Sequence, residues 1–405
     1  MQTLGIQPIL ADMNSRVWNH EAGRITTRDI DGNVVHIGRE DDIDLYVCGF
    51  MCTPFTPNGR RKEWADEHAK TFFSAVRTIS VLRPRVAILE NVMAISNNAN
   101  AAVVRRALST LFNYIICFTK VNTTDFGVPH HRPRVYMVAF RKDESLKKIF
   151  LDRSQNVVEQ YLLRKLVRMQ QPCSVDFNNF LADLGHPIRP NMMSEKSVKS
   201  GCTCAGPMAI CTIHPCKCNM CHSHGEMSKK CVWRRYHRQH MKKGLFLNKR
   251  RQYLKVWRKI RNDKKLKSPP CYFDLARKKG LDTEVVGQRR CRDVLRIYAQ
   301  QGNLMSNKCV LNLSKSLGRA SLRKDGVLPT IGHGCLGCFI PSAAAFLSTS
   351  QLMCLSGFDP AEHVKIFEAI ETQKDSDMDL LLGNAMSVPV IGSVAACALS
   401  MIAPP

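Results

Sequence analysis

Three groups of chemically active residues lie in order along the first third of the chain. The first is Cys52, in the stretch GFMCTPFTPNGRR (49–61) that directly follows an apolar run. Glu90 comes 38 residues later, and Arg132 and Arg134 come 42 and 44 residues after Glu90. A thiol can be a nucleophile, a carboxyl group can donate a proton, and guanidinium groups stabilise negative charge. The set favours covalent catalysis, although a single cysteine in a turn is more often a small buried hydrophobe.

The elements that must position these residues follow from the apolar pattern of residues 1–141. Strands alternate there with helices, which predicts an α/β fold with a parallel, doubly wound sheet. Ligands bind beyond the carboxyl ends of the strands in such sheets, where these three groups are expected. The expected strands are Pro8–Asp12, Ile43–Cys48, Val86–Leu89, Tyr114–Val121 and Val135–Phe140, and the expected helices are Ala65–Leu82, Ala101–Phe112 and residues 155–169.

The same stretches resemble the motifs of the cytosine-5 DNA methyltransferases. Met51–Thr56 is similar to the family's loop Pro-Cys-x-Pro-Phe-Ser, and Glu90–Val92 matches its Glu-Asn-Val. Gly127–Arg134 is similar to its Gly-Val-Pro-Gln-x-Arg-x-Arg. Near the C-terminus, GNAMSVPVI (383–391) resembles the closing Gly-Asn-Ser-Val-x-Val motif, and LSTSQLMCLSGF (347–358) resembles the stretch before it.

These motifs keep the family's order over residues 5–141 and 326–400, and the resemblance implies a Rossmann-like methyltransferase fold. It also implies that Cys52 attacks carbon 6 of cytosine, with a pKa lowered by nearby positive charge. Glu90 would then protonate ring nitrogen 3, while Arg134 and Arg132 supply the charge and hold the ring carbonyl. The methyl donor would be S-adenosylmethionine. The base must leave the duplex, because its reacting atoms are unreachable inside the stack.

The part of the family pattern that binds the cofactor is incomplete. Nothing in residues 1–42 matches the family's opening Gly-rich turn, so the sheet is expected to begin one strand late, as an N-terminally truncated version of the fold. Either the chain is incomplete or cofactor binding has been lost. By resemblance, Asp12 would bind the ribose and Asp29 the adenine amino group, with Ile30 in the same motif and Asn384 in the closing motif. Asp12 and Asp29 are equally consistent with ordinary acids at strand ends.

Three departures fall within the matching motifs. Met51 replaces the family's proline, and His130 replaces the glutamine beside the arginines, which adds a titratable group. Ala385 and Met386 stand where Ser-Val is usual. These changes bear on activity more than on fold.

The domain organisation follows from the same comparison. We expect a first catalytic part at 1–141, a target-recognition insertion at 142–325, and a last catalytic part at 326–405. The insertion is basic: residues 229–268 hold 17 Lys or Arg and one acid, and the whole chain carries a net charge of +25. Such charge favours contacts with nucleic acid phosphates, and it is also compatible with a nuclear-localisation signal.

Cysteines and histidines are frequent between residues 202 and 231. Their number would suffice for structural zinc, but their spacing departs from the regular paired scheme, and surface thiols in a loop are the alternative. No metal is expected at the catalytic residues. The start of the chain lacks the order of a secretory signal, so the 18 cysteines are expected to be thiols or ligands. We expect no membrane span, and a location in the nucleus if the source is eukaryotic, otherwise in the cytoplasm or nucleoid.

Three functions remain open from the sequence. The first is a DNA cytosine-5 methyltransferase that acts on double-stranded DNA with S-adenosylmethionine. The second is a tRNA cytosine-5 methyltransferase, which one branch of the family performs on a similar scaffold. The third is an inactive nucleic-acid-binding relic that has lost the cofactor.

Overall fold

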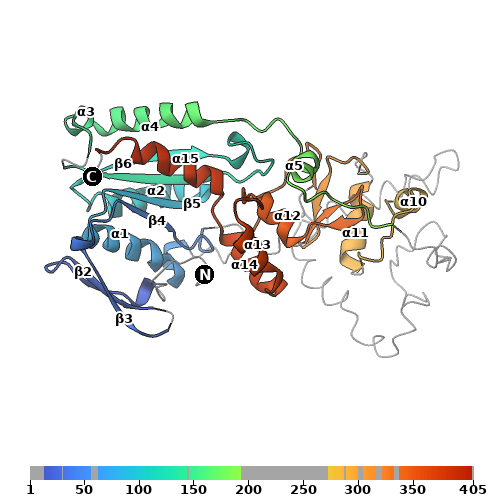
Figure 1. Ribbon diagram of the computed structural model, residues 1–405, viewed down its shortest axis with the longest axis horizontal. Helices are drawn as coiled ribbons and strands as arrows, with labels where there is room; N and C mark the ends of the chain where they lie inside the picture. The colour runs from blue at the N-terminus through green and yellow to red at the C-terminus, as the bar shows by residue number, and fades with distance from the viewer. Residues whose placement is uncertain are drawn as a thin grey trace. The chain divides into compact units, whose positions relative to one another are not determined.

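The computed structural model divides into two compact units (Figure 1). The first comprises Met1–Val175 and Met353–Pro405, and the second Asp176–Leu352. The divisions that we predicted at 141 and 325 concern function and stay a prediction. Asp12, Ile30 and the segments 202–231 and 229–268 lie outside the described residues. The structure describes residues 13–29, 31–55, 63–143, 146–192, 272–286, 289–299, 304–314, 322–332 and 337–403.

A four-stranded sheet forms the centre of the first unit. Its strands, in spatial order, are β4 (Leu45–Gly49), β5 (Val86–Val92), β7 (Arg134–Arg141) and β6 (Tyr114–Val121). β4 and β5 are parallel, as predicted, but β7 is antiparallel to both of its neighbours. Between β6 and β7 the chain forms only the short turn Thr123–Asp125, and a parallel return would need a longer crossover, usually a helix. The sheet is therefore mixed.

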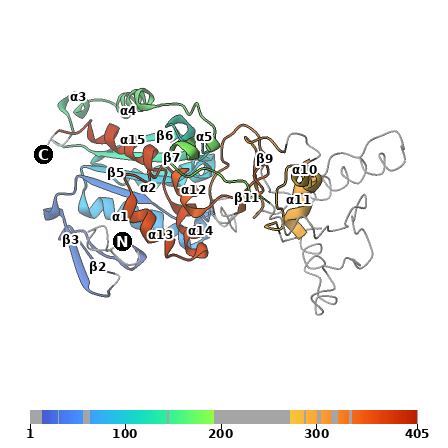
Figure 2. The same cartoon turned by 45° about the vertical axis from the view of Figure 1, so that its right-hand side comes forward.

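Helices cover both faces of this sheet. α1 (Lys70–Leu82) and α2 (Asn98–Leu108) pack on one face, and α4 (Gln155–Met169) and α15 (Val388–Leu399) pack on the other. Both views show α15 beside α4 (Figures 1 and 2). β5 contributes alternate residues to the two cores, which is why its first four residues, Val86–Leu89, are all apolar. The doubly wound α/β class is thereby confirmed.

The spacing of apolar residues explains α1 and the end of that helix. Its buried residues include Phe72, Ala75, Val76 and Ile79, which share one face at helical spacing. The helix ends at Arg83, which takes a left-handed conformation (φ 54°) and donates its amide hydrogen to the Ile79 carbonyl. Pro84 follows and cannot continue the helix.

A three-stranded antiparallel sheet precedes the central one, and the sequence analysis did not foresee it. It consists of β1 (Val17–Asn19), β2 (Arg24–Arg28) and β3 (Val34–Gly38). Its strands are short, and Ile25 is the residue that β2 buries against Val81 and Leu82 of α1. A strand with so few apolar positions has a weak alternating pattern.

The second unit has a small sheet and a separate core. The sheet runs β11 (Ala345–Phe346), β10 (Cys338–Ile340), β8 (Val310–Asn312) and β9 (Leu322–Arg323). Buried side chains of α10 (Tyr272–Lys278), α11 (Arg289–Ala299), β8 and β10 form one apolar cluster, which includes Tyr272, Leu295, Leu311 and Phe339. The unit thus folds around its own core, as an inserted domain should. Its helices are α5 (Phe177–Asp183), α10 and α11.

Four further α-helices belong to the described part of the chain. α3 (Lys148–Leu151) precedes α4, and α12 (Thr349–Cys354) crosses from the second unit into the first. α13 (Val364–Glu371) and α14 (Asp375–Asn384) lead from there to α15. One stretch, Leu380–Leu399, is long and apolar enough to span a membrane by length and composition alone. Its α15 part packs into the core beside the sheet, as the helices of globular domains do.

Candidate active site

The nucleophile candidate lies in a tight turn beyond the carboxyl end of β4. β4 ends at Gly49, and three residues later the Cys52 carbonyl accepts a hydrogen bond from the Phe55 amide at 3.0 Å. The Phe55 ring packs edge-on against Trp64, with 4.8 Å between the ring centres. The turn is thereby anchored in the core, while the Cys52 side chain is only partly buried.

Glu90 and Arg134 form a buried ion pair on two neighbouring strands. The Arg134 Nε lies 2.9 Å from the Glu90 Oε1, and each side chain is only 9% exposed. Strand register explains the pairing: Val92 of β5 lies opposite Arg134 of β7, two residues beyond Glu90. Burial raises the pKa of Glu90, although the charges of Arg134 and Arg132 oppose that shift. Part of the Glu90 population therefore keeps its proton to a higher pH than an ordinary glutamate does.

The Cys52 thiol lies within the electrostatic field of this pair. Burial raises the pKa of Cys52, Arg134 and Arg132 lower it, and Glu90 raises it further. The net direction is upward, so the expected low pKa is wrong for this state of the site: the cost of desolvating a thiolate exceeds the attraction of the two arginines. The structure nevertheless brings Cys52, Glu90, Arg132 and Arg134 together, as predicted. Their roles stay a prediction.

Gly49 provides the close approach that this arrangement needs. A Cβ atom at that position would lie 2.8 Å from the Met386 Cε and 3.4 Å from the Glu90 Oε2. Met386 of the closing motif therefore lies close above the end of β4, and the end of its flexible side chain would have to move if position 49 carried a side chain.

Arg132 holds the closing motif against the site. Its Nη2 donates hydrogen bonds to the Ala385 carbonyl at 2.5 Å and to the Gly383 carbonyl at 3.3 Å. Its backbone amide donates to the Asn122 Oδ1 at 2.8 Å. Burial and the neighbouring Arg134 lower the pKa of Arg132 to about 10, so it is still charged at neutral pH. These bonds bring the two ends of the catalytic sequence, 250 residues apart, to one site.

Two residues beside the site were not given a role from the sequence. Asn91 is fully buried, and its Nδ2 donates to the Phe50 carbonyl at 2.9 Å, which ties β5 to the turn of Cys52. Its place directly after Glu90 was the available signal. His130 is also fully buried and hydrogen-bonds the Leu355 backbone. Burial and the two arginines lower the pKa of His130 well below its usual value, so the ring is neutral at neutral pH.

Of the residues predicted to bind the cofactor, Asp29 and Asn384 lie in the described part of the chain. Asp29 lies in the exposed turn between β2 and β3, where its Oδ1 accepts the Asn33 amide at 2.8 Å and its Oδ2 accepts the Asn33 side chain at 3.0 Å. These bonds lower the pKa of Asp29 and engage both oxygens, so the turn does not fit an adenine contact without rearrangement. Asn384 is exposed at the end of α14, between the two carbonyls that Arg132 holds, and it fits a cofactor contact beside the site.

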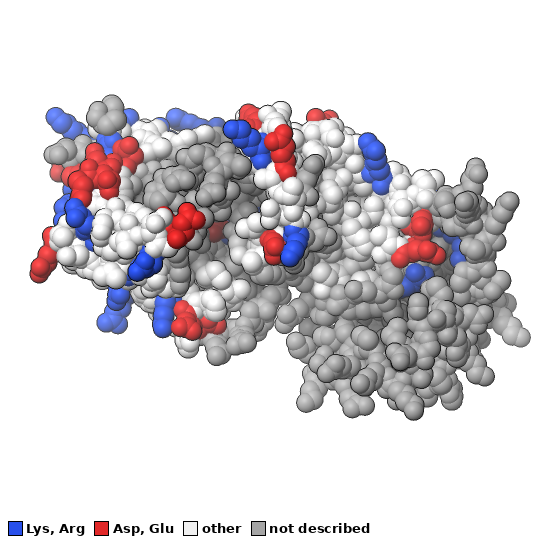
Figure 3. Space-filling model, turned by 60° about the horizontal axis from the view of Figure 1, so that its bottom comes forward, with Lys and Arg blue, Asp and Glu red and all other residues white. Residues whose placement is uncertain are grey.

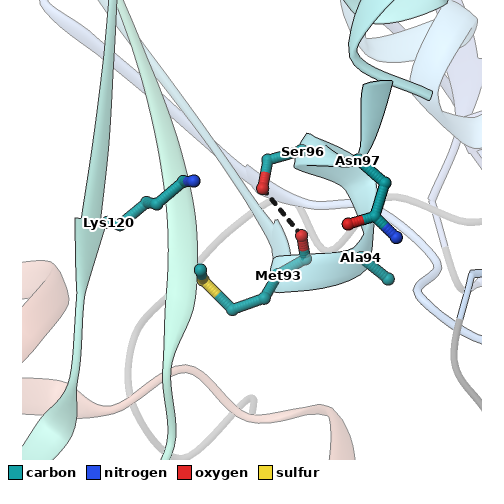
Figure 4. A pocket seen from close by; sticks show the side chains of 5 residues that line it. All are labelled: Met93, Ala94, Ser96, Asn97 and Lys120. Atoms are coloured by element: carbon teal, nitrogen blue, oxygen red, sulfur yellow. Dashed lines mark hydrogen bonds between the residues drawn. The ribbon is translucent and has the colours of Figure 1, made fainter. Parts of the chain in front are cut away.

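A cavity of about 500 Å³ lies beyond the end of β5 (Figure 4). Met93, Ala94, Ser96 and Asn97 line it from the segment after β5, and Lys120 lines it from β6. The Ser96 hydroxyl donates to the Met93 carbonyl at 2.8 Å and so is already engaged. Within the described part of the chain, no cluster of three or more His, Cys, Asp or Glu suits a metal ion. The cluster at 202–231 lies outside it.

The comparisons with known proteins agree with the geometry. The model of the family "C-5 cytosine-specific DNA methylase" matches residues 10–398, and the chain belongs to this family. It is 30% identical to the type II methyltransferase M.DsaV of Dactylococcopsis salina over 27% of this chain and 31% of that protein. It is 28% identical to M.HhaI of Haemophilus parahaemolyticus over 29% of this chain and 37% of that protein.

These matches are partial, since the chain spans about a third of the length of the curated relatives. Among solved structures, the match to a mutant DNMT2 of Spodoptera frugiperda covers 89% of this chain and 80% of that chain. The two are 12% identical, with a TM-score of 0.36.

Proposed function

We propose that the chain methylates carbon 5 of cytosine in double-stranded DNA, with S-adenosylmethionine as the methyl donor. The observation that carries the proposal is the meeting of Cys52 with the Glu90–Arg134 ion pair at one sheet edge. A thiol, a carboxyl group with a raised pKa and a fixed cation are the three groups that covalent activation of a pyrimidine needs.

The chain's own residues account for the covalent steps. The Cys52 thiol first loses its proton to solvent, and the thiolate then adds to carbon 6 of the flipped cytosine. The electron pair of the 5,6 double bond moves through the ring toward nitrogen 3. Glu90 in its acid form gives nitrogen 3 a proton, which leaves carbon 5 nucleophilic. After methylation, carbon 5 loses its proton to solvent, which restores the 5,6 double bond and expels Cys52 as thiolate, and nitrogen 3 returns its proton to the Glu90 carboxylate. Arg134 keeps Glu90 in place and lowers the cost of negative charge on the thiol.

The cofactor contributes an electrophilic methyl group when it is bound. Asn384 and the predicted contacts Asp12 and Ile30 would hold it, whereas Asp29 would first have to give up its bonds to Asn33. The place of Asn384 beside the carbonyls that Arg132 holds supports its role. Arg132 keeps Asn384 at the site through the neighbouring carbonyls of Gly383 and Ala385.

The family favours DNA over tRNA as substrate, since the model that matches is that of a DNA methylase. The basic segment 229–268 would contact phosphates of either nucleic acid. Transfer of labelled methyl groups to duplex DNA and to tRNA, at equal cytosine concentration, separates the two. We expect transfer to DNA that Cys52→Ser abolishes. Transfer to tRNA alone would replace DNA by tRNA, and transfer to neither would support the relic. A DNA substrate would place the protein in the nucleus or nucleoid.

A role for Glu90 as the acid can be tested separately. Glu90→Gln keeps the shape of the side chain but cannot give up a proton. We expect kcat to fall by about 100-fold or more, the usual range for loss of a general acid, with the Kd for duplex DNA changed less than about 3-fold. A kcat within about 3-fold of wild type would exclude Glu90 as the proton donor.

A further inference from the structure

The peptide unit that ends at Met51, the residue before the nucleophile, is held at both of its polar groups. This unit joins Phe50 to Met51, and Cys52 follows it. Its carbonyl oxygen accepts the Asn91 Nδ2 at 2.9 Å, from β5. Its amide hydrogen goes to the Thr71 Oγ1 at 3.2 Å, from the first turn of α1. The two bonds come from different elements.

Such a double contact fixes the plane of the peptide. The C=O and N–H groups of a trans peptide point in opposite directions, and the unit is rigid, so it can turn only about the line between its two Cα atoms. One hydrogen bond still allows that rotation, whereas bonds on opposite sides stop it. The direction in which the chain enters Met51, the residue before Cys52, is thereby set by Asn91 on one side and Thr71 on the other.

Thr71 is well placed to act as a rigid anchor. Its side chain is 8% exposed, and its hydroxyl hydrogen goes to the His68 carbonyl at 2.8 Å. The oxygen is therefore oriented to accept the Met51 amide. Asp66 stabilises the turn that contains His68, because its carboxylate accepts a hydrogen bond from the His68 amide at 3.1 Å.

We propose that Thr71 is a positioning residue for Cys52, which acts by accepting the amide hydrogen of Met51. This inference rests on the proposed function, in which the thiol must meet carbon 6 of the base. The residue at position 51 is decisive, because a proline there would have no amide hydrogen to give. Methionine leaves a donor beside the nucleophile, and Thr71 satisfies it.

The test is a double-mutant cycle between positions 51 and 71. Thr71→Val keeps the branched shape and removes the hydroxyl; Thr71→Ser keeps the hydroxyl; Met51→Pro removes the donor. We expect Thr71→Val to lower kcat about 10-fold with KM for DNA changed less than about 2-fold, because misplacing a reacting group by about 1 Å can cost up to about 100-fold. Thr71→Ser should stay within about 3-fold of wild type.

The same Thr71→Val change in the Met51→Pro background should cost less than about 2-fold, because no amide hydrogen is left to hold. An equal loss in both backgrounds, or no loss in the wild-type background, would overturn the proposal. Thr78→Val is the matched control, since Thr78 is a buried threonine on the same helix whose hydroxyl donates to Ser74 and not to the turn. We expect it to leave kcat unchanged at a temperature where the protein is folded.

Alkylation of Cys52 by iodoacetamide separates this inference from the proposed function. The rate is followed on the Cys52 peptide by mass spectrometry and needs neither DNA nor cofactor. Loosening the peptide exposes the partly buried thiol, so we expect the rate to rise about 3-fold or more in Thr71→Val and not in Thr71→Ser or Thr78→Val. If these alkylation rates are found but no methyl transfer is detected, the positioning role of Thr71 stands and the proposed enzymatic function is rejected. Equal rates in all variants would reject the anchor whatever the activity. If Met51→Pro does not fold, the positioning role of Thr71 is tested by comparing kcat and the alkylation rate of Thr71→Val with those of Thr71→Ser.

Discussion

At the scale of single residues, the site holds a thiol that is not yet activated. Burial dominates the electrostatics of Cys52, and the arginines compensate only in part. The thiol is therefore protonated at neutral pH, and adding it to a base requires loss of that proton. This state resembles a resting enzyme in which a reactive thiolate is not exposed to other electrophiles.

The reactivity of Cys52 should depend steeply on pH. Below a raised pKa, the fraction of thiolate grows about 10-fold for each pH unit, so alkylation by iodoacetamide should speed up continuously from pH 7 to pH 8.5. Cys117 is an internal control, because it is fully buried and its pKa is raised to about 12. Its peptide should stay unmodified. A Cys52 rate that is constant above pH 7 would mean that the arginines outweigh burial.

At the scale of elements, much of the site's frame was predictable. The strands of the central sheet lie within three residues of their expected ends, because each is a continuous apolar run between turns. β7 is antiparallel because the connection from β6 is too short for a crossover helix. The apolar pattern of a strand does not predict its direction in the sheet. The hydrogen bond from the Met51 amide to the Thr71 hydroxyl could not be predicted from the sequence, since threonine is common in the first turn of a helix.

The loop before β7 should make folding sensitive to acid. His130 is buried and its pKa lies well below the ordinary value of about 6.5, so the unfolded chain binds a proton there that the folded chain excludes. Stability contributed in this way is present above pH 6.5 and is lost as the pH falls below it, by up to about 1.4 kcal/mol per pH unit. We expect His130→Gln, the family's residue, to make the free energy of unfolding less dependent on pH between 5 and 6.5.

Denaturant unfolding at several pH values measures this effect. The comparison of the two proteins removes the contributions of the other titrating groups, which both share. Parallel curves for wild type and His130→Gln would show that His130 binds its proton in the folded state as well.

At the scale of the whole molecule, positive charge is concentrated in one part of the sequence. On the face drawn in Figure 3, Lys and Arg of the described residues are interspersed with Asp and Glu. Residues 229–268, by contrast, carry 17 basic residues and a single acid. Affinity for nucleic acid should therefore come mainly from that segment.

Binding to duplex DNA should weaken strongly with salt. Each phosphate contact adds about 0.9 to the slope of log K against log salt concentration, so replacing Lys249, Arg250 and Arg251 by alanine should reduce the slope by up to about 3. Fluorescence anisotropy at several salt concentrations gives both slopes. Arg28→Ala, a change on the separate β2 strand, should leave the slope unchanged. An unchanged slope in the triple variant would place the phosphate contacts elsewhere.

The central claim is that Cys52 becomes bonded to carbon 6 of a cytosine in DNA. A duplex with 5-fluorocytosine tests it most directly, because fluorine on carbon 5 cannot leave as a proton does and the adduct is trapped after methylation. With S-adenosylmethionine present, the wild-type chain should form a denaturant-resistant complex that maps to the Cys52 peptide, and Cys52→Ser should form none. Absence of the complex with the wild-type protein, or its formation at another residue, would contradict the account.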